Sequence, residues 1–422
     1  MTFSTDTYDI VIAGGGMVGA SLALQLSCHS QQQLRILVVE SFPVAEKKSS
    51  EAPTYSPSFD ARSTALSYSS QLILEPLGVW PLLAKHNAGI KSIHVSERGQ
   101  PGSTIMHSED VDWPALGGVV ENAWLGNVLL SALHKNNNIE FLAPASVKSI
   151  NPQQQGVELT VEQHDREKTI GAQLAIIVDG ANSGLREKLG ISTKEHNYQQ
   201  AALVANVSFT KAHNGCAYER FTDQGPMALL PLSDSELSQP RSALVWSLPN
   251  DQAQHLLSCD EAEFLQTLQQ RFGHRQGEFI RVGDRFSYPL KLVEAQEQVR
   301  SGIVVMGNAA HSLHPVAGQG FNLALRDCAR LTQVLAQAYQ QKHALGDLGL
   351  LQSYQQQQYL DQQKTITFSD QLPALFTRKQ WALSLFRGLG LGVLDIAPPL
   401  KSQFIHHAAG LHDGAALGHH LS

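Results

Sequence analysis

The chain has 422 residues, of which 42% are hydrophobic and 16% are charged, and its formal net charge is −7. This length predicts two or three domains, and the composition excludes an intrinsically disordered chain. The acidic balance, without any run of Lys or Arg, excludes a basic surface for nucleic acid.

The N-terminal residues predict a βαβ unit rather than a signal peptide, because residues 1–9 are polar and acidic. A buried strand at 8–13 leads into Gly14, Gly16 and Gly19, a helix follows at 20–27, and a second strand at 34–40 ends in Glu40. Gly14 permits a tight turn, Gly16 lets the backbone approach a pyrophosphate, and Gly19 allows close packing. An acid at position 40 favours the ribose of FAD or NAD over NADP.

The next segment predicts a loop at 41–59 and a helix over 60–77 that carries Arg62. Arg62 reaches either a phosphate or a flavin edge, or it is a surface arginine, and its residue type does not separate these roles. Further strands are expected at 90–97, 139–142 and 145–150, a helix at 125–133, and a hairpin over 157–174.

A second strand-to-loop motif follows at 174–186. The apolar strand ends in Asp179 and Gly180, and Ser183 can cap the helix after it. This arrangement places a carboxylate and bare backbone at the edge where doubly wound sheets bind ligands. An ordinary strand-to-helix turn is the alternative.

From residue 198 the pattern changes to antiparallel strands, expected at 201–209, 216–221, 227–232, 242–248 and 279–289, with a helix at 260–271. Helices are expected at 350–360, around 366–376 and at 381–396. No stretch reaches the roughly 20 apolar residues of a membrane span. The four cysteines, at 28, 216, 259 and 328, are scattered, which indicates a reducing compartment.

The last motif lies in residues 303–327, where a buried strand ends at Gly307 and a loop with Pro315, Gly318 and Gly320 leads into a helix. Free backbone N–H groups at such a helix start suit an anion or an electron-rich ring edge. His311 and His314 have no third ligand at metal-binding spacing, so we expect no metal. Ser183 lacks the GxSxG pattern of a serine nucleophile.

Taken together, GxGxxG at 14–19, Asp179-Gly180-x-x-Ser-x-x-Arg186 and the Gly307-Asn308 motif up to Gly320 resemble the FAD-dependent aromatic hydroxylases of the para-hydroxybenzoate hydroxylase fold. The segments at 59–67, 119–122, 198–207 and 219–232 are similar to the ubiquinone-biosynthesis branch of that family. The resemblance covers nearly the whole chain.

The resemblance implies an α/β fold: a single-Rossmann FAD-binding domain with an inserted antiparallel-sheet substrate domain and C-terminal helices. The FAD domain is expected to be discontinuous, over 1–75, 115–190 and 285–345. The substrate domain is expected over 76–114 and 191–284, and the helical region over 346–422.

The resemblance also implies which residues meet the cofactor. Gly14, Gly16 and Gly19 hold the FAD pyrophosphate, Glu40 holds the ribose, and Arg62 and Asn122 lie along the phosphates. Asp179 and Gly180 shape the second edge, Asn308 contacts the ribityl chain, and Asn322 belongs to the same site. The flavin-ring environment consists of Pro315, Gly318, Gln319 and Gly320, and the substrate pocket of Leu229, Leu230 and Pro231.

Two departures from the family pattern concern this site. Asn308 stands where most of the wider family has Asp, and Asn127 stands where it often has Arg. The Gly-Asn pair resembles the 2-polyprenyl-6-methoxyphenol hydroxylases, so it sharpens the assignment to one branch.

The implied activity is hydroxylation of a polyprenylated methoxyphenol in ubiquinone biosynthesis, with NAD(P)H as reductant, O2 as co-substrate and a flavin C4a-hydroperoxide as oxidant. Two alternatives stay open: a hydroxylase for another ring position or a soluble aromatic, and an FAD-binding scaffold subunit of a biosynthetic complex. We expect a cytoplasmic protein. Apolar residues at 381–394 either contact the inner membrane or a partner peripherally or pack on the protein itself. Ring position, prenyl length, NADH or NADPH preference and oligomeric state stay open.

Overall fold

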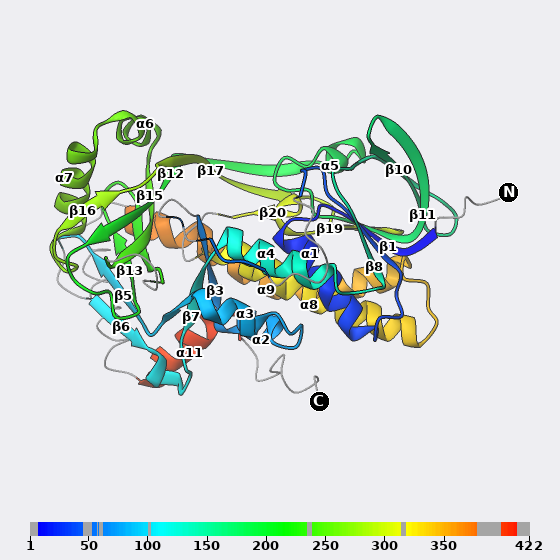
Figure 1. The fold of residues 1–422 in the computed structure, drawn as a ribbon, viewed down its shortest axis with the longest axis horizontal. Coiled ribbons are helices and arrows are strands. Elements are labelled where there is room, and N and C mark those ends of the chain that lie inside the picture. Colours follow the sequence, from blue (N-terminus) through cyan, green and yellow to red (C-terminus); the bar gives the residue numbers. More distant parts are fainter. Residues whose placement is uncertain are drawn as a thin grey trace.

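The computed structural model describes residues 7–44, 53–56, 58, 62–99, 103–233, 239–313, 318–377 and 398–411. Its two large sheets lie toward opposite ends of an elongated molecule, and long strands run between them (Figure 1). Within the described ranges, no helix combines the length and the apolar character that a membrane crossing requires.

The first sheet is a doubly wound, mostly parallel sheet of eight strands. Strands β19, β11, β1, β2 and β8 are parallel neighbours in that order. The bounds are β1 Thr7–Ala13, β2 Ile36–Val39, β8 Ile139–Leu142, β9 Ser146–Pro152, β10 Val157–Gln163, β11 Arg166–Ile177, β18 Val299–Arg300 and β19 Ile303–Val305. The expected βαβ unit and the hairpin over 157–174 are therefore confirmed.

Helices cover the first sheet because its central strands are apolar on both faces. Strand β2 is buried throughout, and Ile10 and Ile12 of β1 face a different core from Val11 and Ala13. The covering helices are α1 Met17–His29, α4 Asn122–Leu133 and α8 Gln319–Gln340 on one face and α5 Gly184–Lys188 on the other.

A small antiparallel sheet, in the order β3-β7-β4, lies between the two lobes. Its strands are β3 Ser63–Ser67, β4 Asn87–Ile90 and β7 Gly117–Glu121, and the short helices α2 Tyr68–Leu74 and α3 Trp80–Leu83 follow β3. The prediction of a helix over 60–77 was therefore wrong for 63–67. Tertiary pairing with β7 overrides the helical pattern there, and the helix starts only at Tyr68.

The second sheet is mainly antiparallel and has nine strands in the order β20-β17-β12-β15-β14-β13-β5-β6, with β16 beside β12. The bounds are β5 Ser92–Glu97, β6 Ser103–His107, β12 Thr193–Phe209, β13 Cys216–Phe221, β14 Pro226–Pro231, β15 Arg241–Pro249, β16 Phe279–Val282, β17 Phe286–Ala295 and β20 His311–Ser312. Helices α6 Asn250–Ser258 and α7 Glu261–Phe272 pack on one face of this sheet.

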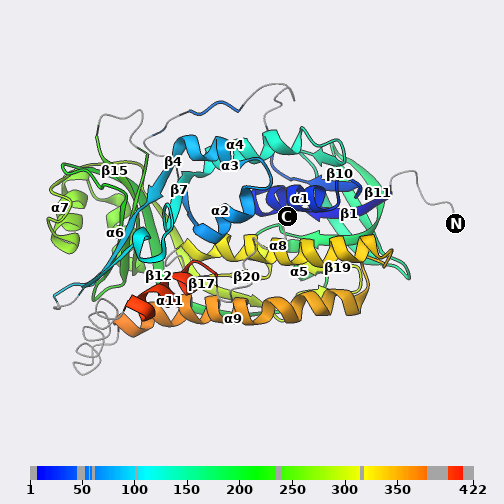
Figure 2. The ribbon, with the colours of Figure 1, turned by 90° about the horizontal axis from the view of Figure 1, so that it is seen from below.

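The C-terminal region is helical, as expected, although 350–376 form one helix rather than two. Helix α9 runs over Leu348–Thr377 beside α8, and α11 covers Pro398–Ala408 (Figure 2). The helix expected at 381–396 lies outside the described residues.

Candidate active site

The carboxyl ends of the parallel strands bring the three sequence motifs to one edge of the first sheet. The glycine loop follows β1, Glu40 follows β2, Asp179 follows β11, and Asn308 follows β19. Because β19, β11, β1 and β2 are consecutive neighbours, their loops adjoin at the edge where doubly wound sheets bind ligands.

The glycine loop has the shape that a pyrophosphate requires. Gly14 has φ +115°, and a Cβ there would lie 2.5 Å from the Val178 carbonyl oxygen. A Cβ on Gly19 would collide with the Gly14 carbonyl, so this glycine is required by packing. Gly16 is exposed, and a Cβ at this position would have no other heavy atom within 4 Å. No side chain among the described residues caps α1. The N-terminus of α1 is therefore open toward solvent, which fits a diphosphate.

Glu40 is held in place by backbone donors. Its Oε2 accepts a 2.7 Å hydrogen bond from the Gly15 N–H, and its Oε1 accepts one of 2.8 Å from the Phe42 N–H. Oε1 also accepts from the Ser41 hydroxyl at 3.4 Å. A carboxylate offers about four acceptor positions, so Oε2 retains capacity for a ribose hydroxyl. The donors Gly15 and Phe42 were not identified from the sequence, because backbone groups leave no motif.

The start of α8 forms the other end of the candidate site. Gly318 is its N-cap, with φ +61° and no capping side chain, and a Cβ there would lie 3.2 Å from the Ala65 Cβ. The positive end of the α8 dipole and the N–H groups of its first turn therefore lie beside β3. Pro315 lies outside the described residues.

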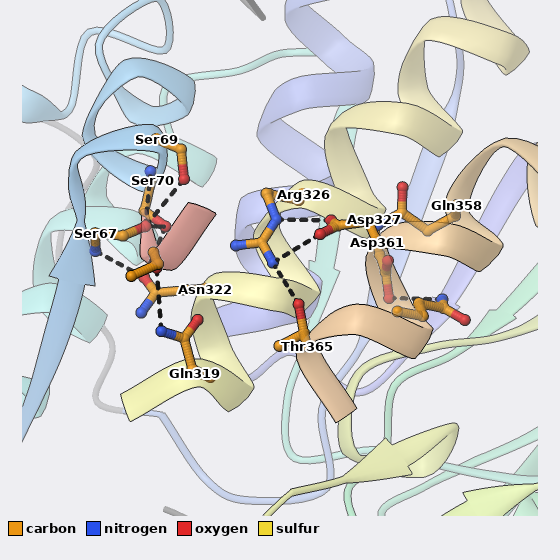
Figure 3. Close-up of polar contacts among 12 residues, drawn as sticks. Ser67, Ser69, Ser70, Gln319, Asn322, Arg326, Asp327, Gln358, Asp361 and Thr365 are labelled. Atoms are coloured by element: carbon orange, nitrogen blue, oxygen red, sulfur yellow. Dashed lines mark hydrogen bonds and ion pairs between the residues drawn. The ribbon is translucent and has the colours of Figure 1, made fainter. Parts of the chain in front are cut away.

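Asn322 is buried and uses its whole side-chain amide within the protein (Figure 3). Its Oδ1 accepts from the Ser67 N–H and the Ser70 hydroxyl, at 2.9 and 2.7 Å. Its Nδ2 donates to the carbonyls of Ala65 and Gly318, at 3.0 and 2.9 Å. The amide is saturated, so we reassign Asn322 from cofactor contact to a positioning residue that fixes α8 against β3.

Gln319, expected in the ring environment, is buried as well. Its Nε2 donates to the Ala408 carbonyl at 3.2 Å, which joins the start of α8 to α11. Gly320 lies in the first turn of α8, with nothing within 4 Å of a built Cβ.

Arg62 and Asn122 both lie at the small sheet. Arg62 is exposed, and its Nη1 donates to the Tyr288 hydroxyl of β17 at 2.9 Å. The Asn122 Oδ1 accepts from the Thr64 hydroxyl at 2.6 Å. The link from Arg62 to the second sheet was not expected from sequence, because it joins residues 226 positions apart.

The loops after β11 and β19 are tied together by Arg186, a residue of the second motif that the sequence reading left without a role. This buried side chain donates from Nη1 to the Ala309 carbonyl at 2.7 Å. Ser183 caps α5 as expected, accepting from the Arg186 N–H at 3.1 Å. Asp179, Gly180 and Asn308 are not fully buried, so they remain accessible to a ligand.

His311 is buried beside a carboxylate. Its Nε2 lies 3.2 Å from the Asp327 Oδ2, which also accepts from the Gln362 Nε2 at 3.1 Å. Among the residues that the structure describes, no group of three His, Cys, Asp or Glu side chains is placed to hold a metal ion.

The three residues expected in the substrate pocket lie on opposite faces of β14. Leu229 is fully buried in the core that α7 covers, so its side chain points away from the first sheet. Leu230 packs on the other face, with residues of β4 and β7. Pro231 is buried and, by strand alternation, shares the side of Leu229. Leu230 therefore stays a proposed pocket residue. Leu229 and Pro231 point to the opposite face of β14 and are not proposed as pocket residues.

Comparison with known proteins gives consistent family relations. The "FAD binding domain" family model matches residues 7–369. The chain is 33% identical to "Ubiquinone hydroxylase UbiL" of Rhodospirillum rubrum, over 95% of this chain and 89% of the relative. It is 29% identical to "3-demethoxyubiquinol 3-hydroxylase" of Escherichia coli, over 96% and 98% of the two chains.

Solved structures show the same fold. The chain is similar to p-nitrophenol 4-monooxygenase PnpA of Pseudomonas putida, with a TM-score of 0.74 at 17% identity over 97% of this chain and 99% of that one. It is also similar to pqsL of Pseudomonas aeruginosa, described as a probable FAD-dependent monooxygenase, with a TM-score of 0.73 at 19% identity over 92% and 100% of the chains. The family match, together with a glycine loop whose shape suits a diphosphate, shows that this chain belongs to the FAD binding domain family. It is a flavin-dependent monooxygenase with FAD as its cofactor.

Proposed function

We propose that this protein hydroxylates the aromatic ring of a polyprenylated phenol in ubiquinone biosynthesis, with NAD(P)H as reductant and O2 as co-substrate. The observation that carries the proposal is the full-length similarity to relatives named for ubiquinone hydroxylation. The convergence of three nucleotide-binding motifs at one sheet edge supports it.

The residues divide the work of binding. The N-terminus of α1, opened by Gly16, receives the diphosphate, and Glu40 receives the ribose hydroxyls. The loop of Asp179 and Asn308 lies beside them at the same edge. FAD, when bound, supplies the activation of O2, and the protein supplies orientation and electrostatics.

The start of α8 acts on charge at the ring end. No side chain among the described residues caps it, so its first N–H groups and its dipole favour negative charge next to Gly318. Asn322 keeps this terminus against β3, and Leu230 lines the side of the second sheet that faces it. The apolar cluster that Leu230 joins would exclude water from this side of the site.

The proposal is tested with purified protein and a short-chain prenylated 2-methoxyphenol as the probe. We expect a yellow, FAD-containing protein whose NADH or NADPH oxidation is stimulated by the probe and matched by hydroxylated product. Phenol and a soluble benzoate serve as controls for substrate class. Flavin reduction without hydroxylated product from any of the phenols overturns the proposal and favours a scaffold role.

The ring position needs a second measurement. The quinone precursor that accumulates when the gene is deleted identifies the carbon that lacks oxygen. Accumulation of a precursor that already carries all ring oxygens would contradict a hydroxylase role in this pathway.

A further inference from the structure

The second sheet has one face that looks toward the first sheet, which we call the interface face. Ala217 of β13, Leu230 of β14 and Ala243 of β15 lie on it, and they pack in one cluster with residues of β4 and β7. Side chains alternate along a strand, so Glu219 shares the face of Ala217. Tyr218 lies on the opposite face, in the core that α7 covers.

The small sheet connects the interface face to the ring end of the FAD site. Ala65, Val119 and Ala88 are cross-strand partners, so their side chains share one side of this sheet. Val119 and Ala88 pack in the same cluster as Ala217. At the β3 end of this set of three cross-strand partners, Ala65 lies next to Gly318. Glu219 and the start of α8 therefore flank the same side of the small sheet.

The residues opposite Glu219 on the two adjacent strands are apolar and offer its carboxyl no hydrogen bond. Its cross-strand partners are Val95 of β5 and Ala228 of β14. Within the ranges that the structure describes, no donor or cation pairs with its carboxyl, although the side chain is accessible in part to a water-sized probe. A carboxyl kept without a partner among apolar side chains costs stability, which suggests a use in the active enzyme.

The electrostatic surroundings agree with this picture, since burial alone raises the pKa of Glu219 to about 7. Strand β14 offers no ionisable group, and β5 offers His94, on the face of Tyr218, and Glu97, opposite Phe221. Helix α9 offers Asp370, whose Oδ1 accepts from the Tyr198 hydroxyl at 2.6 Å.

The cations on the interface side already have counter-charges. The Lys401 Nζ of α11 lies 2.9 Å from the Asp110 Oδ2, and the Arg241 Nη2 of β15 lies 2.7 Å from the Glu121 Oε1.

Other charges near β13 lie on its opposite face. Arg220 follows Glu219 in the strand and donates from Nε to the Arg271 carbonyl of α7 at 3.3 Å. Arg275, also on that side, contacts His94. None of these groups therefore faces the Glu219 carboxyl.

We propose that Glu219 is the catalytic base of the hydroxylation and takes the proton of the substrate phenol. The phenol O–H bond breaks, the carboxylate gains an O–H bond, and the electron pair stays on the oxygen as a phenolate. The phenolate is the more electron-rich ring, so it attacks an electrophilic oxygen faster than the neutral phenol. The proton passes to water when product leaves. This inference rests on the proposed function, since it requires a phenolic substrate.

The base has a suitable acidity for this task. A general base works best when its pKa lies near the operating pH, and an ordinary solvated glutamate, near 4.3, is about three units too acidic. Burial on the interface face raises the pKa of Glu219 into that range.

The test compares Glu219→Gln with the wild type for FAD content, rate of flavin reduction by NAD(P)H, and hydroxylation of the prenylated 2-methoxyphenol across pH 5.5–9. We expect normal FAD content, product formation reduced by about 10²-fold or more, and loss of the limb in kcat that rises through pH 7. Glu219→Asp, which keeps a carboxyl, should restore part of the rate and the pH limb. Glu97→Gln, on the next strand, is the matched control and should keep the wild-type profile.

A wild-type pH profile and product yield in Glu219→Gln would overturn the assignment. A second readout needs no turnover: the infrared carboxyl band that titrates near pH 7 in the wild type should be absent from Glu219→Gln. If the wild type hydroxylates no phenol but the band is present, the proposed function fails while the unusual carboxyl stands. If the wild type hydroxylates and the band is missing, the base assignment alone fails.

Discussion

At the scale of single residues, a substitution at Gly16 should affect cofactor binding but not folding. Gly16 has an ordinary φ, and a Cβ there would meet open space, so Gly16→Val should fold with a melting temperature close to that of the wild type stripped of its FAD. Its side chain would occupy the place of the diphosphate at the start of α1. We expect the purified variant to lack FAD, as measured by flavin absorbance per protein.

Gly19→Val is the comparison, because a Cβ there collides with the Gly14 carbonyl. This variant should lose folded protein as well as FAD. A Gly16→Val protein that purifies with a full complement of flavin would contradict the nucleotide-binding role of the loop.

Glu219 predicts a stability change whose sign depends on pH. Its pKa rises from 4.5 in the unfolded chain to about 7 in the folded protein, so the native state binds more protons between these values. The wild type therefore loses stability as pH rises through 7. Glu219→Leu removes that loss, and its melting temperature should exceed the wild-type value by more at pH 8 than at pH 5.

The control for this effect is Glu167→Leu, an exposed position on β11, which should change stability by less than about 0.5 kcal/mol. Differential scanning calorimetry at both pH values measures the effect. A Glu219→Leu variant less stable than the wild type at pH 8 would show that the carboxyl has a structural partner.

At the scale of elements, α8 and α9 are joined by an ion pair between the buried Arg326 and the partly buried Asp361 (Figure 3). The Arg326 Nε lies 2.7 Å from the Asp361 Oδ2, and Arg326 also donates to Thr365. Asp361→Asn would leave the guanidinium buried without a counter-charge, so we expect unfolding to become easier by about 3 kcal/mol in urea titration. Loosening α8 should also weaken FAD binding, because the N-cap of this helix, Gly318, lies at the ring end of the proposed cofactor site.

The matched control is Glu297→Gln, which removes the carboxylate of an ion pair with Arg300 that is more than a third exposed on both sides. Its effect should stay below about 1 kcal/mol. Equal effects of the two variants would mean that burial does not govern the Arg326 pair.

Local sequence patterns defined elements well where one structural period was dominant. The βαβ unit, the hairpin of β10 and β11 and the capped start of α5 follow from alternation, glycines and Ser183. The pattern failed at 63–67, where Ser and Thr allow either structure and pairing with β7 decides. It also placed a break inside α9, since Lys364 and the polar residues around it interrupt the apolar periodicity but not the backbone.

At the scale of the whole molecule, one buried ion pair joins the second sheet to the small sheet. The Arg241 Nη2 lies 2.7 Å from the Glu121 Oε1, with side chains only 2% and 5% exposed. Arg241 donates as well to the carbonyls of Ser58 and Ser233. The charge of Glu121 adds to burial in raising the pKa of Tyr55 to about 12.

Glu121→Gln should therefore destabilise the contact between the lobes by about 3–5 kcal/mol, because it leaves Arg241 buried without a counter-ion. In thermal unfolding, the transition monitored by flavin fluorescence should begin at a lower temperature than the transition monitored by far-UV circular dichroism. The double variant with Arg241→Met should recover part of the loss. Glu162→Gln, at the exposed pair with Lys148, is the control, and a loss of similar size there would contradict this role.

The sequence by itself determined the cofactor class and the order of the binding motifs. Gly14, Gly16, Gly19 and Glu40 are local requirements of a tight turn, a close phosphate approach and a terminal acid, so they can be identified along the chain. The resemblance extended this reading to the reaction class, which the family comparisons bear out.

Only the tertiary structure decided which side chains share a face and which are already partnered. Asn322 proved saturated by Ala65, Ser67, Ser70 and Gly318, and Leu229 proved to face away from the first sheet. Glu219 acquired its significance only when β5 and β14 surrounded it with apolar neighbours. Desolvation depends on residues far apart in the chain, and no local pattern encodes it.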